Sequence, residues 1–600
     1  MSFRLFCFFL LSCACVFSKA EDDWRYRFST VKKHLYDSIT HVDLSKDTTI
    51  QMPQPSIAYV NIKGVSTMPI NKSIKRLGYL EVLDGNGRYF KKHVIFRGQG
   101  NYSVRFEKKN FSAEFCETNW SAENLTDIKI GDWVSQEKFH FKAFYTDFMR
   151  GIGEIGYKIF DDVVADRDPY WERCGYDKES IARCYPDGFP CVVYMNDVFY
   201  GVYAWQLKKS RKNMNQKKKK SEHIHLDGDL RDNYIFRGNV DWTTFEVRNP
   251  EYLYTMYNNV YDGDAPQELM DTTSLYYSMD SDNDDVKENK KRTAEAKSNI
   301  VSMSNYYNEL HDMDSLGISE ADFKKEFERR YDVDGLIDYY VYYRLCMNGD
   351  GVIKNWQWFT YNGVKWCVTP YDLDQIFGLS LYGFYVQPRR SVSNLDQGPY
   401  EWVNKYYAEE ERERYFDLRD RNVFSEENIV SHIQDWHDRV GDYFYDLEKE
   451  MWPDSPCYND VECNKNWNLY ENEENYYMTL EYSPTRTYFA GDICVYEGRL
   501  WICTSTSKGV IPVSRNSAVD SMERLVSWVG ERIKFLDEFY GYSEHLEALD
   551  CEPSIHDNNV GRKVVGIYDM SGTRLTSARK GVNIYKYDDG SSRKVVLKAE

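Results

Sequence analysis

The order of its predicted elements constrains the fold of this chain more than any other feature. From residue 57 to about residue 115, short β-like runs such as IAYVNIKG, LGYLEVLDGNG and KKHVIFRG alternate with turns. A strand–turn–strand with Asn-Asp at its turn, CVVYMNDVFYGVYAW, follows at residues 191–205. Residues 294–345 and 407–450 have the apolar spacing of long helices. Strands gathered in one part of the chain and helices in another indicate an α+β fold.

The charge balance excludes nucleic acid as the main partner. The chain has 600 residues, with 76 Lys+Arg against 95 Asp+Glu, which gives a net charge of −19. Binding of a phosphate backbone needs a basic face instead. A hydrophobic content of 42% is that of a globular protein, and the length suffices for several cores.

The first 20 residues have the pattern of an export signal. An arginine precedes an apolar run, and Ser18 and Ala20 occupy positions −3 and −1 of a cleavage site before Glu21. The alternative is a lipoprotein signal with Cys13 as the modified residue. No later stretch has the ~18 apolar residues of a membrane-spanning helix. We therefore expect a secreted or cell-surface protein, at the exterior of the outer membrane, without a transmembrane segment.

Cysteines are the second sign of an oxidising compartment. Three of the 14 lie in the signal, which leaves an odd number in the mature chain. We expect disulfides among the cysteines of loop-like sequence, because exported proteins form them. These are Cys174, Cys184 and Cys191 in one stretch and Cys457 and Cys463 in another. No Cys-x-x-Cys pair occurs, which argues against a zinc ribbon.

Two literal motif matches lack the context that their functions require. Residues 151–156 fit G-x-G-x-x-G but show no βαβ unit, so we expect small residues on a packed helix rather than a dinucleotide site. The acidic run at residues 280–284 opens like a calcium loop. It has Asp285 in place of the glycine and Lys291 in place of the final glutamate, so the calcium reading fails.

The segment from residue 348 to residue 378 points to phosphoryl transfer. Asp350 and Asn355 have the D-x-x-x-x-N spacing of a kinase catalytic loop, in which the Asp accepts the hydroxyl proton of the substrate and the Asn holds a metal ion. An Asn-Gly turn and the segment PYDLDQIFG follow, and they place Asp372 where kinases have a metal-binding aspartate. Cations are needed to hold the phosphates of ATP. Strand-like sequence upstream supplies Arg97, Lys108, Lys109 and Lys142.

Taken together, seven segments resemble the spore-coat CotH kinase family of exported, atypical protein kinases. In the order of the family they are QGNYSVRFEKKNF (99–111), GDWVSQEKFHFKAFYTDFMRG (131–151), VVYMNDVFYGVYAWQLKK (192–209), HIHLDG (223–228), WTTFEVRNP (242–250), NGDGVIKNWQWF (348–359) and VTPYDLDQIFG (368–378). The resemblance implies a bilobal kinase-like fold that uses ATP and Mg²⁺ or Mn²⁺ to phosphorylate Ser or Thr of a surface or secreted protein.

The resemblance also implies the roles of individual residues. Asp350 would be the catalytic base and Lys142 the catalytic, phosphate-contacting lysine. The metal ligands would be Asn355 and Asp372, supported by Asp374. Further nucleotide contacts would come from Arg97, Lys109 and Arg150.

Two departures from the family pattern leave an alternative open. Tyr102-Ser103 replaces a pair of small residues in the phosphate-facing loop, and Gln206, followed by Lys208-Lys209, stands where many members have Glu. The alternative is a catalytically inactive surface adhesin or glycan-binding protein on the same fold. A glycosidase would need two carboxylates on either side of a sugar, and no motif supports one.

Two smaller resemblances lie C-terminal to the core. YFAGDICVYEGRLWICTSTSKGVIP (488–512) resembles a chitin-binding-type carbohydrate-binding module. Its Tyr488, Tyr496 and Trp501 would stack on the sugars of an insoluble polysaccharide or mucin glycan, or else would pack a small core. Residues 564–598 resemble the C-terminal sorting domain of type IX secretion substrates.

We therefore expect an α+β protein with a bilobal kinase-like core, an inserted β module and a C-terminal β tail. The expected segments are a signal peptide at 1–20, a lead-in at 21–54, the core at 55–450, the β module at 482–515, a closing helix of the core at 520–545 and the sorting-like domain at 555–600.

Overall fold

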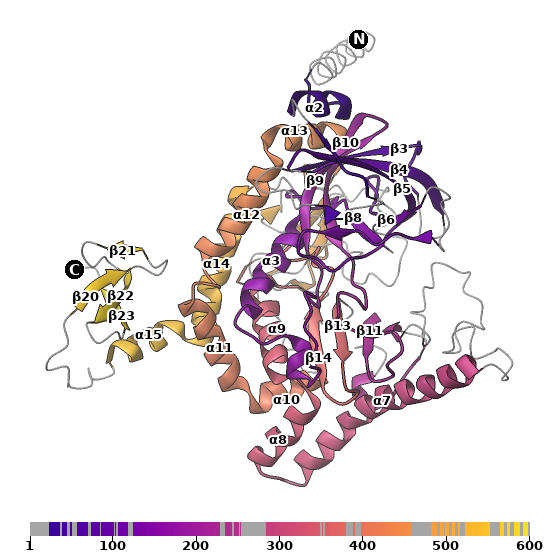
Figure 1. Cartoon of the computed structure of the whole chain (residues 1–600). Coiled ribbons are helices and arrows are strands. Elements are labelled where there is room, and N and C mark those ends of the chain that lie inside the picture. The colour runs from indigo at the N-terminus through magenta and orange to yellow at the C-terminus, as the bar shows by residue number, and fades with distance from the viewer. Residues whose placement is uncertain are drawn as a thin grey trace. The chain divides into compact units, whose positions relative to one another are not determined.

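The computed structural model of the chain combines sheets with many helices, which confirms the α+β class (Figure 1). Contacts within the chain divide it into two units, Met1–Leu536 and Asp537–Glu600. The structure describes residues 23–35, 39–44, 49–50, 57–69, 74–84, 86–100, 103, 106–117, 124–228, 235–242, 245–250, 253, 284–348, 351, 355–379, 388–389, 398–455, 457–458, 482–488, 493–496, 499–502, 507–509, 514–515, 522–551, 564–568, 573–575, 581–587 and 592–597. The predicted signal peptide lies outside these residues.

Strands of the N-terminal part close into a seven-stranded barrel. Because β6 pairs with β5 as well as with β8, the ring has no open edge. The bilobal layout that the resemblance implies remains a prediction. Around the barrel the order is β5 (Arg88–Gly98), β4 (Lys75–Leu83), β3 (Ala58–Lys63), β9 (Gly188–Met195), β10 (Val198–Leu207), β8 (Lys138–Lys142) and β6 (Phe111–Cys116).

The alternation of side chains along each strand fills the barrel with apolar groups. On β8, Phe139 and Phe141 belong to the buried cluster inside the barrel, and Phe141 stacks on Phe111 with ring centroids 4.8 Å apart. Successive side chains of a strand point to opposite faces. His140 and Lys142 therefore lie on the outer face of the barrel, which is the face that carries the candidate site.

A second, antiparallel sheet has the order β12 (Phe245–Asn249), β11 (Ile224–Gly228), β13 (Trp356–Thr360) and β14 (Trp366–Pro370). Its core contains the rings of Trp356, Trp358 and Trp366. In Figure 1 this sheet lies below the barrel, beside several helices. The helices that share its core are α7 (Asp284–Ser315), α8 (Glu320–Arg330), α9 (Val333–Cys346) and α10 (Pro399–Tyr406).

Both predicted hairpin turns form. Between β9 and β10, Asn196 and Asp197 have φ of 51° and 83°, as a tight turn of the primed type requires. Between β13 and β14, the side-chain oxygen of Asn362 accepts hydrogen bonds from the backbone N–H of Val364 at 2.9 Å and of Lys365 at 2.8 Å. The turn chemistry thus sets the register of the hairpin that carries Asp372.

Helix α3 (Ile152–Val164) confirms the packed-helix interpretation of the glycine-rich motif. A Cβ on Gly156 would lie 2.6 Å from Ile376 and 3.0 Å from the side chain of Leu373, so only glycine lets the helix approach this segment. The Asp147 carboxylate accepts hydrogen bonds from the backbone N–H of Gly151 and Ile152, both at 2.7 Å, and so caps the helix. Helix α3 therefore buttresses the segment that follows Asp372.

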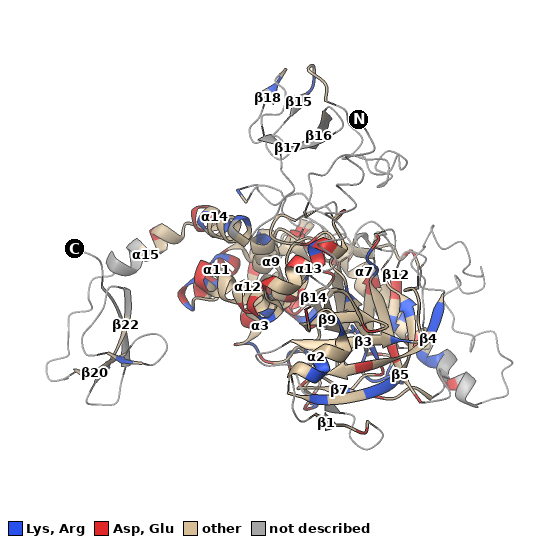
Figure 2. Ribbon diagram, turned by 90° about the horizontal axis from the view of Figure 1, so that it is seen from above, with Lys and Arg blue, Asp and Glu red and all other residues tan. Residues whose placement is uncertain are grey.

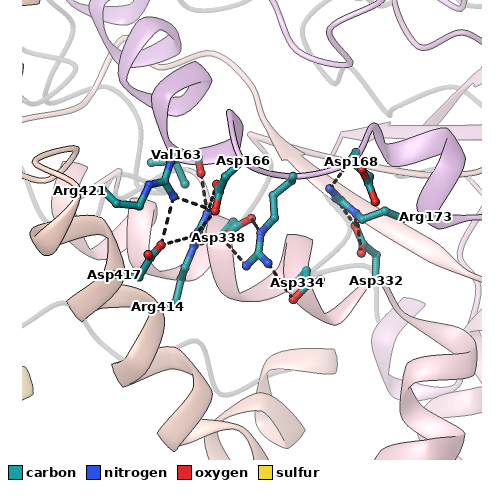
Figure 3. Close-up of polar contacts among 11 residues, drawn as sticks. Val163, Asp166, Asp168, Arg173, Asp332, Asp334, Asp338, Arg414, Asp417 and Arg421 are labelled. Carbon is teal, nitrogen blue, oxygen red and sulfur yellow. Dashed lines mark hydrogen bonds and ion pairs between the residues drawn. The ribbon is translucent and has the colours of Figure 1, made fainter. Parts of the chain in front are cut away.

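An arginine–carboxylate network holds the end of α3 to two other helices (Figure 3). Asp338 of α9 is buried and binds Arg167 at 2.9 Å and Arg414 of α11 (Ala408–Asp420) at 2.7 Å. Arg414 also reaches Asp166 and Asp417. Each buried charge is therefore compensated, as burial requires. The remaining large helices predicted for this region are α12 (Glu426–Val440) and α13 (Asp442–Met451), which are also present.

Two cysteines lie close enough to form a disulfide. Cys174 follows α4 (Tyr170–Arg173), Cys367 is on β14, and their Sγ atoms are 3.0 Å apart in a buried cluster that also contains Cys184. Cys191 lies inside the barrel on β9, as the predicted strand from residue 191 implies, so its grouping with loop cysteines was wrong. We expect Cys174 and Cys367 to be joined in protein made in an oxidising compartment.

Peptide mapping without reduction tests this pairing. The peptides that contain Cys174 and Cys367 should be recovered as one linked species, 2 Da lighter than their sum because two thiol hydrogens are lost. Cys184 should be alkylated in the same sample and serves as the internal control. Full alkylation of Cys174 and Cys367 before any reductant is added would contradict the prediction.

C-terminal to the core, a helix within the predicted closing segment packs on α9. In α14 (Met522–Tyr540) the buried Arg532 donates through Nε to the carbonyl of Arg344 at 2.9 Å. The region 482–515 has strands β15 (Thr487–Tyr488), β16 (Ile493–Tyr496), β17 (Arg499–Ile502), β18 (Ser507–Lys508) and β19 (Ser514–Arg515). Searched over the described residues, the chain has no helix of the length and apolarity needed to cross a membrane.

The unit Asp537–Glu600 contains a four-stranded antiparallel sheet of its own. Its order is β21 (Arg574–Leu575), β20 (Val564–Tyr568), β22 (Gly581–Tyr587) and β23 (Ser592–Leu597). This unit also contains α15 (Tyr542–Cys551). The smaller elements elsewhere are α2 (Phe28–Leu35), η3 (Ile235–Arg237), β1 (Thr40–His41), β2 (Thr49–Ile50) and β7 (Lys129–Ile130).

Candidate functional site

An ion pair between Lys142 and Asp372 joins the barrel to the second sheet. The ammonium of Lys142, the last residue of β8, lies 2.9 Å from Oδ1 of Asp372, a residue 230 positions later. Burial by itself disfavours the charged ammonium, but the carboxylate of Asp372, with Tyr371 and Asp374, outweighs it and raises the pKa of Lys142 above its usual range. Lys142 is therefore a buried, permanently charged lysine.

The β13–β14 hairpin places Asn355 next to the segment of Asp372. Trp356 pairs with Pro370, and beyond this pair the backbone N–H of Tyr371 donates to the carbonyl of Asn355 at 3.2 Å. The two predicted metal ligands, Asn355 and Asp372, are thus brought to the same end of the hairpin. Asp350, the predicted base, lies outside the described residues, so its place in the site stays a prediction.

Asp374 and Lys142 line the same cleft. The cleft is small in this structure: its free volume is about 20 Å³, which is room for a water molecule rather than for a nucleotide. The side-chain oxygen of Asn110 accepts the backbone N–H of Ala143 at 2.6 Å and so fixes the wall beside Lys142. The residues that line the cleft are Ser103, Phe106, Asn110, Lys142, Phe144, Tyr145, Thr146 and Asp374.

Two residues at the candidate site have left-handed backbone. Phe144, which lines the cleft, and Asp372, which binds Lys142, have φ of 42° and 50°. This conformation costs roughly 1–2 kcal/mol for a residue with a Cβ. Such strain persists where the surrounding structure over-determines it, and functional sites are the usual place. The orientation of the Asp372 carboxylate toward Lys142 therefore depends on a strained backbone conformation.

Arg150, a predicted nucleotide contact, lies under the cleft rather than in it. Its guanidinium is fully buried and donates to the carbonyls of Phe144 and Asp147, both at 2.9 Å. Its Nε lies 2.9 Å from Oε1 of Glu448 on α13. Arg150 thus supports the cleft wall, and a direct contact with nucleotide stays a prediction.

The other predicted nucleotide contacts also have protein partners. Arg97 of β5 binds Glu114 of β6 at 2.8 Å. Lys109 donates to the carbonyl of Phe106, and burial lowers its pKa below the usual range. Its neighbour Lys108 is fully buried and binds Glu448 at 2.7 Å. Of the predicted cations, the structure brings Lys142 to the predicted metal ligands.

Glu154 of α3 is a buried acid near Lys142 that the sequence analysis did not identify as a candidate site residue. Its side chain is buried and its Oε1 accepts the amide N–H of Gln206 at 2.6 Å, while Oε2 has no hydrogen-bond partner among the residues that the structure describes. Burial, with a contribution from Asp187, raises the pKa of Glu154 to about 8, so its carboxyl group is mostly neutral at pH 7. Lys142 is close enough to oppose this rise.

The hydrogen bond with Glu154 also explains why this chain has Gln206 where glutamate was expected. A glutamate at this position would add a second buried acid beside Glu154, whereas the amide of glutamine donates a hydrogen bond to it. The sequence feature that could have identified Glu154 is the presence of an acid among the apolar residues of α3, between Ile152 and Ile155. An acid in such a position is buried only where it has a specific partner.

The donor set fits a hard divalent cation such as Mg²⁺. Asn355, Asp372 and Asp374 offer amide and carboxylate oxygens, which are the ligands that Mg²⁺ prefers. Among the described residues, no group of three His, Cys, Asp or Glu side chains is arranged to hold a metal ion. Asn355 is not one of these four residue types, so that statement does not cover a site that includes its amide oxygen.

The predicted sugar-binding residues lie on the small β module. Tyr496 is half-buried at the end of β16, and its ring meets that of Tyr482 edge-to-face with centroids 5.6 Å apart. Tyr488 and Trp501 are on β15 and β17, but their side chains lie outside the described residues. Sugar stacking by these rings stays a prediction.

Comparison with known proteins gives one family. The family model described as CotH kinase protein matches residues 94–479, more than half of the chain. This range includes Lys142, Asn355 and Asp372 and ends before the β module at 482–515. No curated protein matches the chain.

Proposed function

The chain belongs to the CotH kinase protein family, and on this premise we propose that it is an exported atypical kinase that transfers the γ-phosphate of ATP to Ser or Thr of a surface or secreted protein. Family membership alone makes it a kinase-like protein. The observation that carries the finer proposal is the 2.9 Å contact between Lys142 and Asp372. It supports a site in which a phosphate-binding cation and a metal-binding carboxylate meet.

Each residue would have a separate task. Lys142 would bind phosphate oxygens, and its permanent charge suits that role. Asn355 and Asp372, supported by Asp374, would hold Mg²⁺ or Mn²⁺, which when bound neutralises phosphate charge. Asp350 would accept the proton of the attacking hydroxyl. In this structure the ammonium of Lys142 is paired with the carboxylate of Asp372. Nucleotide binding therefore requires Lys142 to release Asp372 and to bind phosphate oxygens instead.

A transfer assay with matched variants tests the proposal. The protein should transfer label from γ-labelled ATP to itself or to a Ser-rich acceptor in the presence of Mg²⁺ or Mn²⁺. Asp350→Asn should keep ATP binding but lose about 10²–10⁴-fold in turnover, because an amide does not accept the hydroxyl proton. Asp177→Asn, in an exposed loop, is the control and should behave as wild type.

Two outcomes would contradict parts of this proposal. A wild-type protein that shows no ATP-dependent thermal shift at millimolar metal would favour the alternative, an inactive kinase-fold surface adhesin or glycan-binding protein. Two departures from the family pattern favour this alternative, Tyr102-Ser103 in the phosphate-facing loop and Gln206 in place of Glu. If ATP binds and Asp350→Asn transfers phosphate as fast as wild type, another residue is the base.

Export and surface attachment belong to the same proposal. The signal-like residues 1–20 and the sorting-like tail support passage across both membranes, with removal or anchoring of the chain after about residue 555. The small β module would hold the protein to a polysaccharide or mucin glycan. Mass spectrometry of the surface or medium fraction should recover the mature chain without its tail. A periplasmic protein with an intact C-terminal Glu600 would contradict this prediction.

A further inference from the structure

A basic cluster continues from Lys142 along the outer face of the barrel. His140 pairs with Gln206 across β8 and β10, so Lys138 and Lys208 extend the two strands in the same direction and on the same face. Lys209 places its ammonium 3.4 Å from the ring centroid of Tyr371, the residue before Asp372. The basic cluster consists of Arg97, Lys138, Lys208, Lys209 and Arg248.

Carboxylates compensate only part of this charge. Glu114 binds Arg97 at 2.8 Å and Lys138 at 2.5 Å. Asp227 in turn binds Lys209 at 2.5 Å and Arg248 at 3.0 Å, and Arg248 also reaches Glu246. Five cations thus face three carboxylates. No ion pair in the described part of the chain involves Lys208.

The electrostatics of the basic cluster favour an added anion. Burial, together with the charges of Lys138, Arg248 and Lys209, lowers the pKa of Lys208 to about 7. Burial and the surrounding lysines also lower the pKa of His140 well below its usual range. Cations that hold one another's pKa down gain stability when an anion binds among them. A bound carboxylate or phosphate would supply that negative charge.

The basic cluster extends along the barrel away from Lys142, the lysine proposed to bind the nucleotide. Lys138 precedes Lys142 by four residues on an extended strand, which corresponds to about 13 Å. At that distance from the Lys142–Asp372 pair, a chain that presents a hydroxyl beside Asp372 would cross the basic cluster. Figure 2 shows Lys and Arg on the barrel strands β4 and β5.

We propose that the basic cluster is a subsite for carboxylate or phosphate groups, and that it selects acceptor segments that are acidic or already phosphorylated next to the target Ser or Thr. The selection of acceptors rests on the proposed kinase function. Lys208 is the main anion-binding side chain, because within the described residues it forms no ion pair with a carboxylate that it would have to release. Lys209 and Arg248 are positioned by Asp227 and contribute fixed charge.

Matched acceptor peptides test the proposal. Three peptides carry the same Ser with flanking Asp/Glu, Asn/Gln or Lys/Arg residues, and wild-type protein should have its highest kcat/KM on the acidic one. The preference for the acidic over the neutral peptide should fall about tenfold in Lys208→Gln and persist in Lys208→Arg. Lys219→Gln, in an exposed lysine run, is the control. Raising the salt concentration should weaken the preference in wild type.

A direct binding measurement separates this inference from the kinase proposal. Fluorescence anisotropy with a labelled acidic peptide, competed by a phosphopeptide or by inorganic phosphate, needs no ATP. Peptide binding that requires Lys208, without any transfer, would support the subsite and contradict the kinase. Transfer that shows no preference for acidic peptides would overturn the subsite and leave the kinase. Loss of ATP affinity in Lys208→Gln, with unchanged peptide preference, would assign the basic cluster to the nucleotide and overturn the proposal.

Discussion

Replacing Asp372 with alanine is expected to abolish metal-dependent ATP binding and phosphoryl transfer. The substitution removes a carboxylate from a site with few oxygen donors, so the charge of the triphosphate would be left uncompensated. Loss of even a supporting residue around a metal typically costs about 10–100-fold in affinity, and loss of a ligand should exceed that. The effect is measured as the Mg²⁺-dependent thermal shift with ATP and as transfer of labelled phosphate.

A second variant at this position separates loss of function from loss of fold. Asp372 has a left-handed φ of 50°, a conformation that asparagine adopts more readily than alanine. Asp372→Asn should therefore fold, keep the backbone of the site and still lose metal-dependent binding, because it removes the negative charge. A folded Asp372→Asn protein that binds ATP and Mg²⁺ as well as wild type would show that Asp372 is not a metal ligand.

Replacing Glu448 with alanine should cause the largest loss of stability. Its Oε1 lies 2.7 Å from Nζ of Lys108 and 2.9 Å from Nε of Arg150, and its Oε2 accepts the backbone N–H of Val202 at 2.7 Å. All three charged side chains are fully buried. Removing the carboxylate that contacts both buried cations should cost about 3–5 kcal/mol in the free energy of unfolding.

Denaturant titration of the variant against two controls tests this prediction. Glu450→Ala, two residues later on α13 and exposed, should change stability by less than about 0.5 kcal/mol. Asp338→Ala also removes a buried acid that binds two arginines. Its partner Arg414 keeps Asp166 and Asp417, so the loss should be smaller than for Glu448→Ala. A loss for Glu448→Ala no larger than that for Glu450→Ala would contradict the prediction.

Elements that depend on local sequence could be predicted. The alternation in Lys-Phe-His-Phe-Lys at residues 138–142 already places Lys142 on the face opposite the two phenylalanines. The Asn362-Gly363 turn predicts a hairpin, and its register then brings Asn355 beside the segment of Asp372. Side-chain period and turn chemistry are fixed by a few neighbouring residues, so both can be read without knowledge of the rest of the chain.

The partners of the charged residues could not be predicted in the same way. Arg150 and Lys109 carry the charge expected of a nucleotide contact, yet the structure engages Arg150 with Glu448, about 300 positions later, and Lys109 with a neighbouring carbonyl. Glu154 was hidden in a glycine motif whose role is close packing on the segment after Asp372. Sequence gives the chemistry of a side chain but not its burial, and burial decides which charges must be paired within the protein.

The sequence by itself therefore determined the secondary structure, the outward face of Lys142 and the hairpin that carries the candidate metal ligands. Only the tertiary structure decided that the strands close into a barrel, that Lys142 meets Asp372 and that Cys174 lies beside Cys367. The physical reason is the separation along the chain over which each kind of interaction acts. Backbone preferences act over a few residues, whereas pairing between segments up to 340 positions apart depends on how the packed cores bring them together.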